Sequence, residues 1–513
     1  MYRRLQRVLD LSFVHDLVAD CYAAGGRPSV DPVVFFKLQL VMLFEGIRSE
    51  RQLMQVVADR LSVRWYLGYD LGEPLPDHSS LTRIRDRYGL DVFRRFFDVI
   101  VERCIAAGLV WGKELFFDAS KVEANASADS MLPRFAVEAH LAHRFSQESD
   151  DTCSPEPEIP LSLPVALPEA TYDDLAAANA ARHDWIAKRG AQQRAVVSKD
   201  YHRISDRKAS RTDPDATLMH TKGNAHPGYH LHYAIDGGKA RVILAALVTP
   251  AEVMENTPML DLLWHARFRW RLWPHHVTGD TKYGTWHNIA AVEREGIRAY
   301  VPLKDYETRS PYFPKSRFSY DAERDVYVCP QGESLRRVGF FRNIRVIRYI
   351  GWPKVCNACP VKDQCTPGKS GRKIERSFDE EDVERVRAYH ETEPYKKAMR
   401  KRQVWIEPLF AEAKVWHGLR RFRLRRLPKV NIEMLLVAST QNIKRLLNHE
   451  RFQRPPRPDG MAGRTFTVFF TAWITAPAAT IQAQYRGRIN SRRIPRPIFQ
   501  RPAPVCDARK PLS

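Results

Sequence analysis

The chain has 513 residues, which is too many for a single hydrophobic core and predicts two to four domains. Hydrophobic residues make up 44% of the chain and charged residues 27%, as in a soluble globular protein. The formal net charge of +21 favours nucleic acid as the partner and, less strongly, an anionic membrane surface.

Two stretches of the sequence bear on where the protein works. Residues 1–20 contain no long apolar segment, so we predict no secretory signal and no disulfide framework among the eight cysteines. The uncharged stretch 465–485 contains threonines, two glutamines and Pro477, and this low hydropathy predicts no membrane span. We therefore expect a cytoplasmic protein that makes no use of a membrane.

Residues 1–110 are predicted to form a helical N-terminal domain. Asp31 and Pro32 are a favoured pair for the start of a helix, because Asp caps the free N–H groups and Pro has the φ angle of the first turn. Ser49 and Gln52 resemble a capping box before the next apolar run. Residues 81–87 follow as a short helix with three arginines. The set suits DNA binding, and an ordinary helical bundle with a solvated basic helix is the alternative.

Residues 111–447 are predicted to form an α/β domain. A short apolar strand ends at Asp118, and strands at 229–236 and 240–248 are joined by a hairpin turn at Asp236. The elements expected after them are a helix at 256–273, a strand at 275–280, a helix at 286–295 and a strand at 297–302. Three strands, then helix, strand, helix and strand, is the succession of an RNase H-like sheet.

Three segments interrupt or extend this domain. Residues 125–200 are acidic and proline-rich at first, and residues 305–380 are aromatic, basic and rich in cysteine; both are predicted to be insertions. Residues 448–513 form a basic, proline-rich tail that we expect to be disordered. This tail is either a DNA-binding arm or extra sequence without a function.

Three acids are candidates for chemistry. Asp118 and Asp280 each end a predicted strand, where ligands bind at the edge of a sheet, and Glu407 lies on a basic helix that can pack beside them. From Tyr395 to Val430 that region has twelve Lys and Arg residues against two acids. Three carboxylates in one place repel unless cations are present, and hard oxygen ligands suit two Mg²⁺ ions that share phosphate oxygens.

Each acid also has a purely structural interpretation. Asp118 can cap a turn or helix that begins in the following residues, and Asp280 can be a turn residue before Tyr283 and Gly284. Glu407 can form a structural ion pair with Arg400 or Arg402. These alternatives stay open on the pattern of each acid alone.

A series of motifs in order along the chain resembles the DDE transposases of bacterial insertion sequences. The matching stretches are Arg27-Pro-Ser-Val-Asp-Pro32, His78-Ser-Ser-Leu-Thr-Arg83, Phe117-Asp-Ala-Ser-Lys-Val-Glu-Ala-Asn-Ala-Ser127, Thr212-Asp-Pro-Asp-Ala216, Gly228-Tyr229, Gly279-Asp-Thr-Lys-Tyr-Gly284, Ile406-Glu-Pro-Leu-Phe-Ala-Glu-Ala-Lys414 and Gly418-Leu-Arg-Arg-Phe422. The resemblance covers about residues 1–447 and implies an all-α N-terminal domain followed by an RNase H-like catalytic domain.

The resemblance also implies site residues and partners. Asp118, Asp280 and Glu407 are carried over as the triad that binds two Mg²⁺ or Mn²⁺ ions, with Glu123 and Asp236 as reserve candidates. The implied reaction is DNA cleavage and strand transfer without a covalent enzyme intermediate. The implied partners are double-stranded DNA, as terminal inverted repeats and as target, and a second copy of the chain on DNA, in a bacterial cytoplasm near the nucleoid.

The helix around the last acid supplies candidates for DNA binding. Relatives carry a Tyr-Arg-Glu-Lys signature, and Lys414 has the spacing of its lysine, while Gln403 stands where the arginine falls and Arg400 where the tyrosine falls. Seven residues are nearly two helical turns, so Glu407 and Lys414 share a helix face. The residues expected to contact DNA are Arg402, Trp405, Lys414, Arg420 and Arg421. Trp405 can stack on an unpaired base, or it can simply pack in the core.

One group of cysteines has the spacing of metal ligands. Cys329, Cys356, Cys359 and Cys365 include a C-x₂-C pair and can form a tetrahedral Zn²⁺ site. Four reduced thiols in a small β-rich insertion are the alternative. For the whole chain, the alternatives to a transposase are a DNA-binding relative without activity and a two-metal nuclease that cuts without joining.

Overall fold

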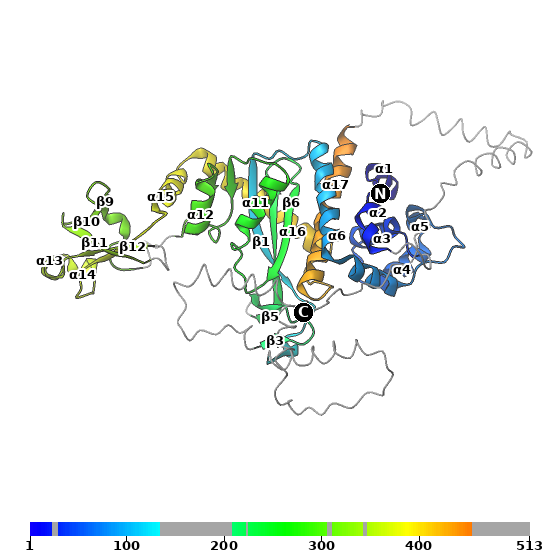
Figure 1. Cartoon of the computed structure of the whole chain (residues 1–513), viewed down its shortest axis with the longest axis horizontal. Coiled ribbons are helices and arrows are strands. Elements are labelled where there is room, and N and C mark those ends of the chain that lie inside the picture. The colour runs from blue at the N-terminus through cyan, green and yellow to red at the C-terminus, as the bar shows by residue number, and fades with distance from the viewer. Residues whose placement is uncertain (23–28, 134–207, 222–223, 305–309, 342–345, 454–513) are drawn as a thin grey trace, which may run out of the picture. The chain divides into compact units, whose positions relative to one another are not determined.

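The computed structural model describes residues 1–22, 29–133, 208–221, 224–304, 310–341 and 346–453 (Figure 1). Most of the 125–200 insertion, the 454–513 part of the tail and the uncharged stretch 465–485 lie outside these residues. The chain divides into two compact units. One contains residues 1–42, 49–96 and the described residues from 443 on, and the other contains residues 43–48 and 97–442. In the described part of the chain, no helix is long and apolar enough to cross a membrane.

The N-terminal part is helical, as predicted. Its elements are α1 (Tyr2–Val8), α2 (Val14–Leu17), η1 (Ala19–Cys21), α3 (Pro32–Phe44), α4 (Glu50–Asp59), α5 (Leu61–Leu67) and α6 (His78–Ala106). Two predicted helix starts are confirmed by their hydrogen bonds. Asp31 Oδ1 accepts the N–H of Val33 at 2.7 Å, and Ser49 Oγ accepts the N–H of Gln52 at 3.4 Å.

The predicted short helix 81–87 was wrong in both bounds, because α6 begins at His78 and continues to Ala106. It is interrupted only at Gly89, whose φ of 63° and ψ of −179° are not helical. One of the three arginines of this stretch is also not on the surface. Arg85 is 1% exposed and forms an ion pair with Glu50, so only its neighbours can contribute to a basic face.

The second unit is built on a six-stranded mixed sheet. Its strands are β1 (Glu114–Glu123), β4 (Thr217–Thr221), β5 (Asn224–Asp236), β6 (Ile243–Pro250), β7 (His276–Thr278) and β8 (Arg298–Tyr300). β5 pairs antiparallel with β6, β4 and β1, while β1, β7 and β8 pair parallel. Helices α11 (Met259–Arg269) and α12 (Trp286–Glu293) lie between the later strands, so the predicted succession of helix, strand, helix and strand after β6 is confirmed (Figure 1). Before α11 the sheet has four strands instead of the predicted three, because β4 also pairs with β5.

The first strand is longer than predicted. β1 does not end at Asp118 but runs on to Glu123, and each residue from Leu115 to Glu123 has a partner on β5. Asp118 lies inside the strand, opposite Tyr233. No helix or turn begins after it, so the interpretation of Asp118 as a cap is wrong. The polar second half of β1 is held by backbone pairing with β5, which does not require apolar side chains.

The long C-terminal helix seals one side of the sheet. Helix α17 (Leu427–Gln453) carries two buried asparagines, Asn431 and Asn442, that bond to the backbone of β6. Asn442 accepts the N–H of Ile243 at 2.9 Å and donates to its carbonyl at 2.8 Å, and Asn431 does the same at Val248 at 2.9 and 3.2 Å. These amides satisfy backbone groups that an edge strand would otherwise leave unpaired.

The Thr212-Asp-Pro-Asp-Ala216 motif has a structural role in this arrangement. Asp213 Oδ1 accepts the N–H of Arg426 at 2.9 Å, and Asp215 Oδ2 accepts the N–H of Leu427 at 2.8 Å. Both N–H groups lie at the start of α17, where four donors have no partner within the helix. The motif therefore fixes the loop that leads into α17.

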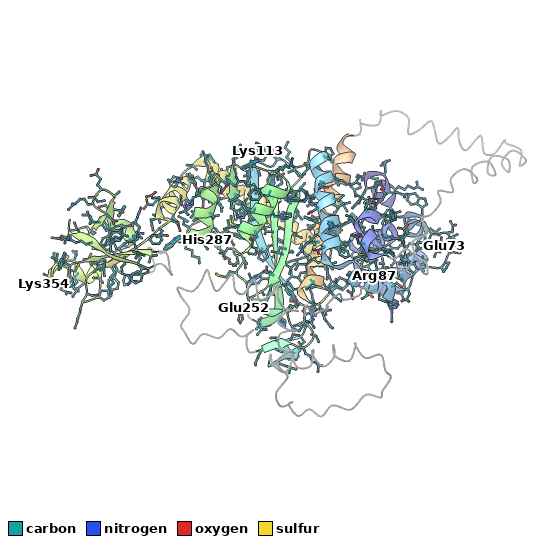
Figure 2. All side chains as sticks on the ribbon, in the orientation of Figure 1. Glu73, Arg87, Lys113, Glu252, His287 and Lys354 are labelled. Atoms are coloured by element: carbon teal, nitrogen blue, oxygen red, sulfur yellow. The ribbon has the colours of Figure 1, made fainter. Side chains whose placement is uncertain are left out.

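The 305–380 region forms a separate small sheet. Its strands, in the antiparallel order β13-β12-β11-β10-β9, are β9 (Ser319–Asp321), β10 (Val326–Val328), β11 (Ser334–Phe341), β12 (Val346–Gly351) and β13 (Lys373–Ser377). The short helices are η4 (Lys315–Arg317), α13 (Pro353–Ala358) and α14 (Lys362–Cys365). At the start of the acidic insertion, η2 (Ala128–Ser130) precedes β2 (Met131–Pro133), which pairs with β3 (Lys208–Ser210). Figure 2 shows the side chains on all these elements.

Candidate functional site

Asp118 is a largely buried acid in the middle of β1. Its Oδ2 accepts a hydrogen bond from Arg402 at 3.0 Å, and its Oδ1 accepts the N–H of Ala119 at 2.9 Å. The pKa of Asp118 is nevertheless raised to about 6, chiefly by burial; Arg402 lowers this pKa, while the negative charges of Asp280 and Glu255 add to the rise. A carboxylate held near others in a poorly hydrated place is a common feature of functional sites.

The turn after β7 presents Asp280 to this acid. Asp280 Oδ1 accepts the N–H of Lys282 at 2.8 Å, and its carbonyl accepts the N–H of Tyr283 at 3.0 Å. A Cβ on Gly279 would lie 2.8 Å from that of Tyr283, and one on Gly284 would lie 2.7 Å from a main-chain carbonyl oxygen. Close packing thus explains why this motif begins and ends with glycine.

Tyr283 lies close enough to both Asp118 and Asp280 to be affected by their charges. The side chain is fully buried, and burial raises the pKa of its hydroxyl well above the ordinary value. The negative charges of Asp118, Asp280 and Glu255 raise that pKa further. The structure therefore brings Asp118 and Asp280, predicted from separate motifs, into one neighbourhood.

Glu255 is an acid of this neighbourhood that the sequence analysis missed. It lies after β6, with a side chain only 10% exposed, 2.6 Å from Lys282 Nζ and 3.9 Å from His230 Nε2. Because β6 and β1 both pair antiparallel with β5, β6 runs in the same direction as β1 and β7, and all three lead toward one edge of the sheet. Strand direction was the signal that could have identified this acid.

Glu407 is exposed on α16 (Glu393–Val415), a helix that crosses the face of the sheet on which Asp118 lies. Arg402, five residues before it, contacts Asp118. Phe410, three residues after it, stacks on Tyr233, the cross-strand partner of Asp118, with ring centroids 4.9 Å apart. At 1.5 Å per residue, Glu407 lies about 7.5 Å along the helix from Arg402 and about 4.5 Å from Phe410.

The structural interpretation of Glu407 as an ion-pair residue is not supported by its neighbours. Arg402 pairs with Asp118, and Arg400 lies 3.8 Å from Glu393. Both arginines proposed as partners of Glu407 therefore contact other acids. Glu407 is therefore exposed to solvent on α16, the helix whose Arg402 contacts Asp118.

The other predicted DNA-binding residues are placed differently from one another. Burial and the charge of Arg420 lower the pKa of Lys414, while Arg420 itself is exposed. Arg421 lies 3.0 Å from Glu123, one of the reserve acids, in a segment that pairs with the end of β1. Trp405 donates from Nε1 to the carbonyl of Gly238 at 3.0 Å, which favours a packing role for this ring.

The second reserve acid, Asp236, is fully used by the backbone. Its carboxylate accepts the N–H groups of Trp111, Gly112 and Gly238 at 3.0, 2.7 and 2.9 Å. Because three backbone N–H groups bond to this one carboxylate, we assign Asp236 the structural role of holding the turn together. The predicted hairpin turn at Asp236 is confirmed, because β5 ends there and β6 returns beside it.

The described residues contain no group of three or more His, Cys, Asp or Glu side chains already spaced to hold a metal ion. The donor chemistry nonetheless fits a hard cation. The negative charges of Asp280 and Glu255 raise the pKa of Asp118, and all three acids raise the pKa of Tyr283. A divalent ion bound among these acids would offset that negative charge. Together these features define an α/β protein in which carboxylates and a basic helix meet at one edge of a mixed sheet.

Two known protein families match parts of this chain. A family described as Transposase domain (DUF772) matches residues 1–87, and a family described as Transposase DDE domain matches residues 328–447. These two matches confirm the resemblance to DDE transposases of insertion sequences, and the DDE domain implies an RNase H-like fold. The second match includes Glu407 and Lys414, whereas Asp118 and Asp280 lie outside both. A search of curated proteins finds no match.

Proposed function

We propose that the chain is an insertion-sequence transposase that binds the ends of its element and catalyses metal-dependent DNA cleavage and strand transfer. The observation that carries this proposal is the arrangement around Asp118. The charge of Asp280 raises the pKa of Asp118, and along α16 Glu407 lies between Arg402, which contacts Asp118, and Phe410, which stacks on Tyr233. The two transposase family matches support the same conclusion.

Asp118, Asp280 and Glu407 would hold two Mg²⁺ or Mn²⁺ ions. When bound, such ions activate the attacking oxygen and stabilise the leaving oxygen of an in-line phosphoryl transfer. Arg402 forms an ion pair with one oxygen of Asp118. If a metal ion balanced the charge of Asp118 instead, the guanidinium of Arg402 would be available to a DNA phosphate. Lys282, two residues after Asp280, forms an ion pair with Glu255, so this acid near Asp118 is already partly neutralised.

The basic residues along α16 and after it supply the DNA contacts. Lys414 lies on the face of Glu407, nearly two turns further on, and the exposed Arg420 follows the end of the helix. Phosphate contacts by such residues hold DNA in position and carry no sequence information. Transposition joins two ends of one element, so we propose that two copies of the chain act together on DNA in the bacterial nucleoid.

The test uses the full chain, DNA carrying the inverted repeats that flank its coding region, and Mg²⁺. We expect cleavage and joining by the wild type, and intact DNA binding without either reaction for Asp118→Asn and Glu407→Gln. Asp261→Asn, an exposed acid on α11, is the control that should keep activity. Cleavage by the Asp118 variant would refute the proposed triad, cleavage without joining would favour a nuclease, and binding without cleavage by the wild type would favour an inactive relative.

A further inference from the structure

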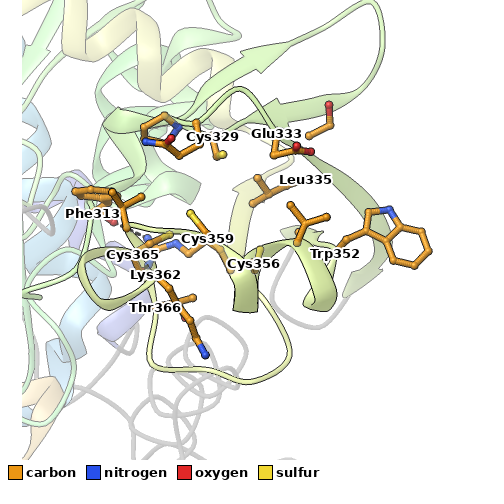
Figure 3. A pocket seen from close by; sticks show the side chains of 17 residues that line it. Phe313, Cys329, Glu333, Leu335, Trp352, Cys356, Cys359, Lys362, Cys365 and Thr366 are labelled. Carbon is orange, nitrogen blue, oxygen red and sulfur yellow. Dashed lines mark hydrogen bonds between the residues drawn. The ribbon is translucent and has the colours of Figure 1, made fainter.

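The four clustered cysteines line one hollow of the small sheet (Figure 3). Cys329 follows β10 and opens the turn to β11, while Cys356, Cys359 and Cys365 come from α13, α14 and the loop between them. The hollow is also lined by apolar side chains that include Phe313 and Leu335, and by polar ones that include Glu333 and Lys362. Two distant parts of the chain thus contribute four cysteines to the wall of one hollow.

The backbone around this hollow is shaped to leave room for sulfur. A Cβ on Gly351 would lie 2.7 Å from Cys356 Sγ, and one on Gly371 would lie 2.3 Å from the carbonyl oxygen of Gly351. The turn at Cys329 closes on itself, because Cys329 N–H donates to Glu333 and Gly332 N–H donates to the Cys329 carbonyl, both at 2.9 Å. Gly332 and Gly371 have φ of 82° and 85°, which other residues adopt at a cost.

The small sheet has a small hydrophobic core. Its cluster of buried side chains contains five residues: Phe318, Tyr327, Leu335, Tyr349 and Ile374. Cys329 and Cys365 pack against this cluster at its rim. A five-stranded sheet with so small a core is the kind of unit that proteins commonly stabilise with a metal ion or a disulfide.

We propose that Cys329, Cys356, Cys359 and Cys365 bind one structural Zn²⁺ ion, which holds the β10–β11 turn against α13 and α14. Four thiolates satisfy the tetrahedral preference of zinc and leave no open position for catalysis. Tetrahedral ligation at about 2.3 Å requires sulfur atoms less than roughly 4 Å apart. The described side chains are not yet at such spacing, so the ion would draw the four thiolates inward from the walls of the hollow.

The test measures metal in the full chain, purified under reducing conditions and desalted. We expect one zinc per chain, and close to none in the double variant Cys356→Ser, Cys359→Ser. Cys21→Ser is the control, because Cys21 is half-buried in η1, outside the group, and should leave the zinc in place. Replacement by Co²⁺ should give thiolate charge-transfer bands and the intense visible bands of tetrahedral cobalt.

A second variant keeps the test informative if the double cysteine variant fails to fold. Gly351→Ala keeps all four thiols but places a methyl group against Cys356, so we expect it to lose zinc to a chelator at least tenfold faster than the wild type. Wild-type protein without zinc and without cobalt bands would overturn the proposal, as would equal zinc in the double variant. DNA cleavage is not part of this test, so failure of the proposed transposase function would leave its outcome unchanged.

Discussion

Replacing Asp118 by asparagine should make the protein more stable, although it should also abolish catalysis. The pKa of Asp118 is about 6 in the folded chain, against 3.8 for the free side chain. A difference of one pKa unit corresponds to about 1.36 kcal/mol, so keeping this buried carboxyl ionised costs the folded state roughly 3 kcal/mol. Asparagine resembles the protonated acid in shape and charge, and its oxygen can still accept a hydrogen bond from Arg402.

The sign of the effect sets its dependence on pH. Because the folded-state pKa of Asp118 is raised, the folded state binds this proton more tightly than the unfolded state does. Below about pH 4 the carboxyl is protonated in both states, and wild type and Asp118→Asn should have similar free energies of unfolding. Between about pH 4 and pH 6 the wild type loses stability relative to the variant, and above about pH 6 the difference should stay near its maximum of roughly 3 kcal/mol.

The assay is thermal or urea denaturation in EDTA at about pH 4, 5, 6 and 7.5, comparing wild type, Asp118→Asn and the exposed control Asp261→Asn. The variant should melt several degrees above the wild type at the higher pH values only, while the control follows the wild type. Adding Mg²⁺ at pH 7.5 should raise the melting temperature of the wild type and not that of the variant. A difference that is independent of pH, or a wild type that is the more stable protein at pH 7.5, would refute this account of Asp118.

Three further predictions concern its surroundings. Glu255→Gln removes a charge that raises the pKa of Asp118, so the pH at which the wild type and the Asp118 variant diverge should move down in this background; an unchanged midpoint would contradict the assignment. Lys414→Ala should weaken DNA binding for all sequences alike and reduce the slope of log K against log salt by about 1, measured by fluorescence anisotropy. Asn442→Ala leaves the N–H and carbonyl of Ile243 without partners, and should lower the free energy of unfolding by about 1–3 kcal/mol per lost partner in urea denaturation.

Local signals in the sequence predicted much of the fold. The helix starts at Pro32 and Glu50 followed from caps whose side chains bond the first free N–H groups, so a few adjacent residues suffice to specify them. The order of strands and helices from β5 to β8 followed from apolar runs separated by turn residues. At these places the signal lies within a few adjacent residues, and the sequence and the structure agree.

The errors arose where distant partners decide the structure. The second half of β1 looks like a polar turn in the sequence, but β5 supplies a backbone partner for each of its residues as far as Glu123. The helix after His78 looks short, yet the chain resumes helical geometry after Gly89. In β1, the extent of the element depends on contacts that no local pattern contains.

The candidate site shows the same division between local and distant information. The turn around Asp280 could be predicted because its glycines and acid lie within six residues, and strand direction explains why it faces Asp118. The contact between Arg402 and Asp118 could not, since 284 residues separate them. That contact also changes the interpretation of the basic helix: one of its arginines compensates an acid of the sheet before any DNA is present. The positive charge of α16 therefore stabilises an acid of the folded protein as well as being available to DNA. The effect of Mg²⁺ on this helix should differ from its effect on a surface that only binds phosphate, because Mg²⁺ near Asp118 would also weaken the pull of that acid on Arg402.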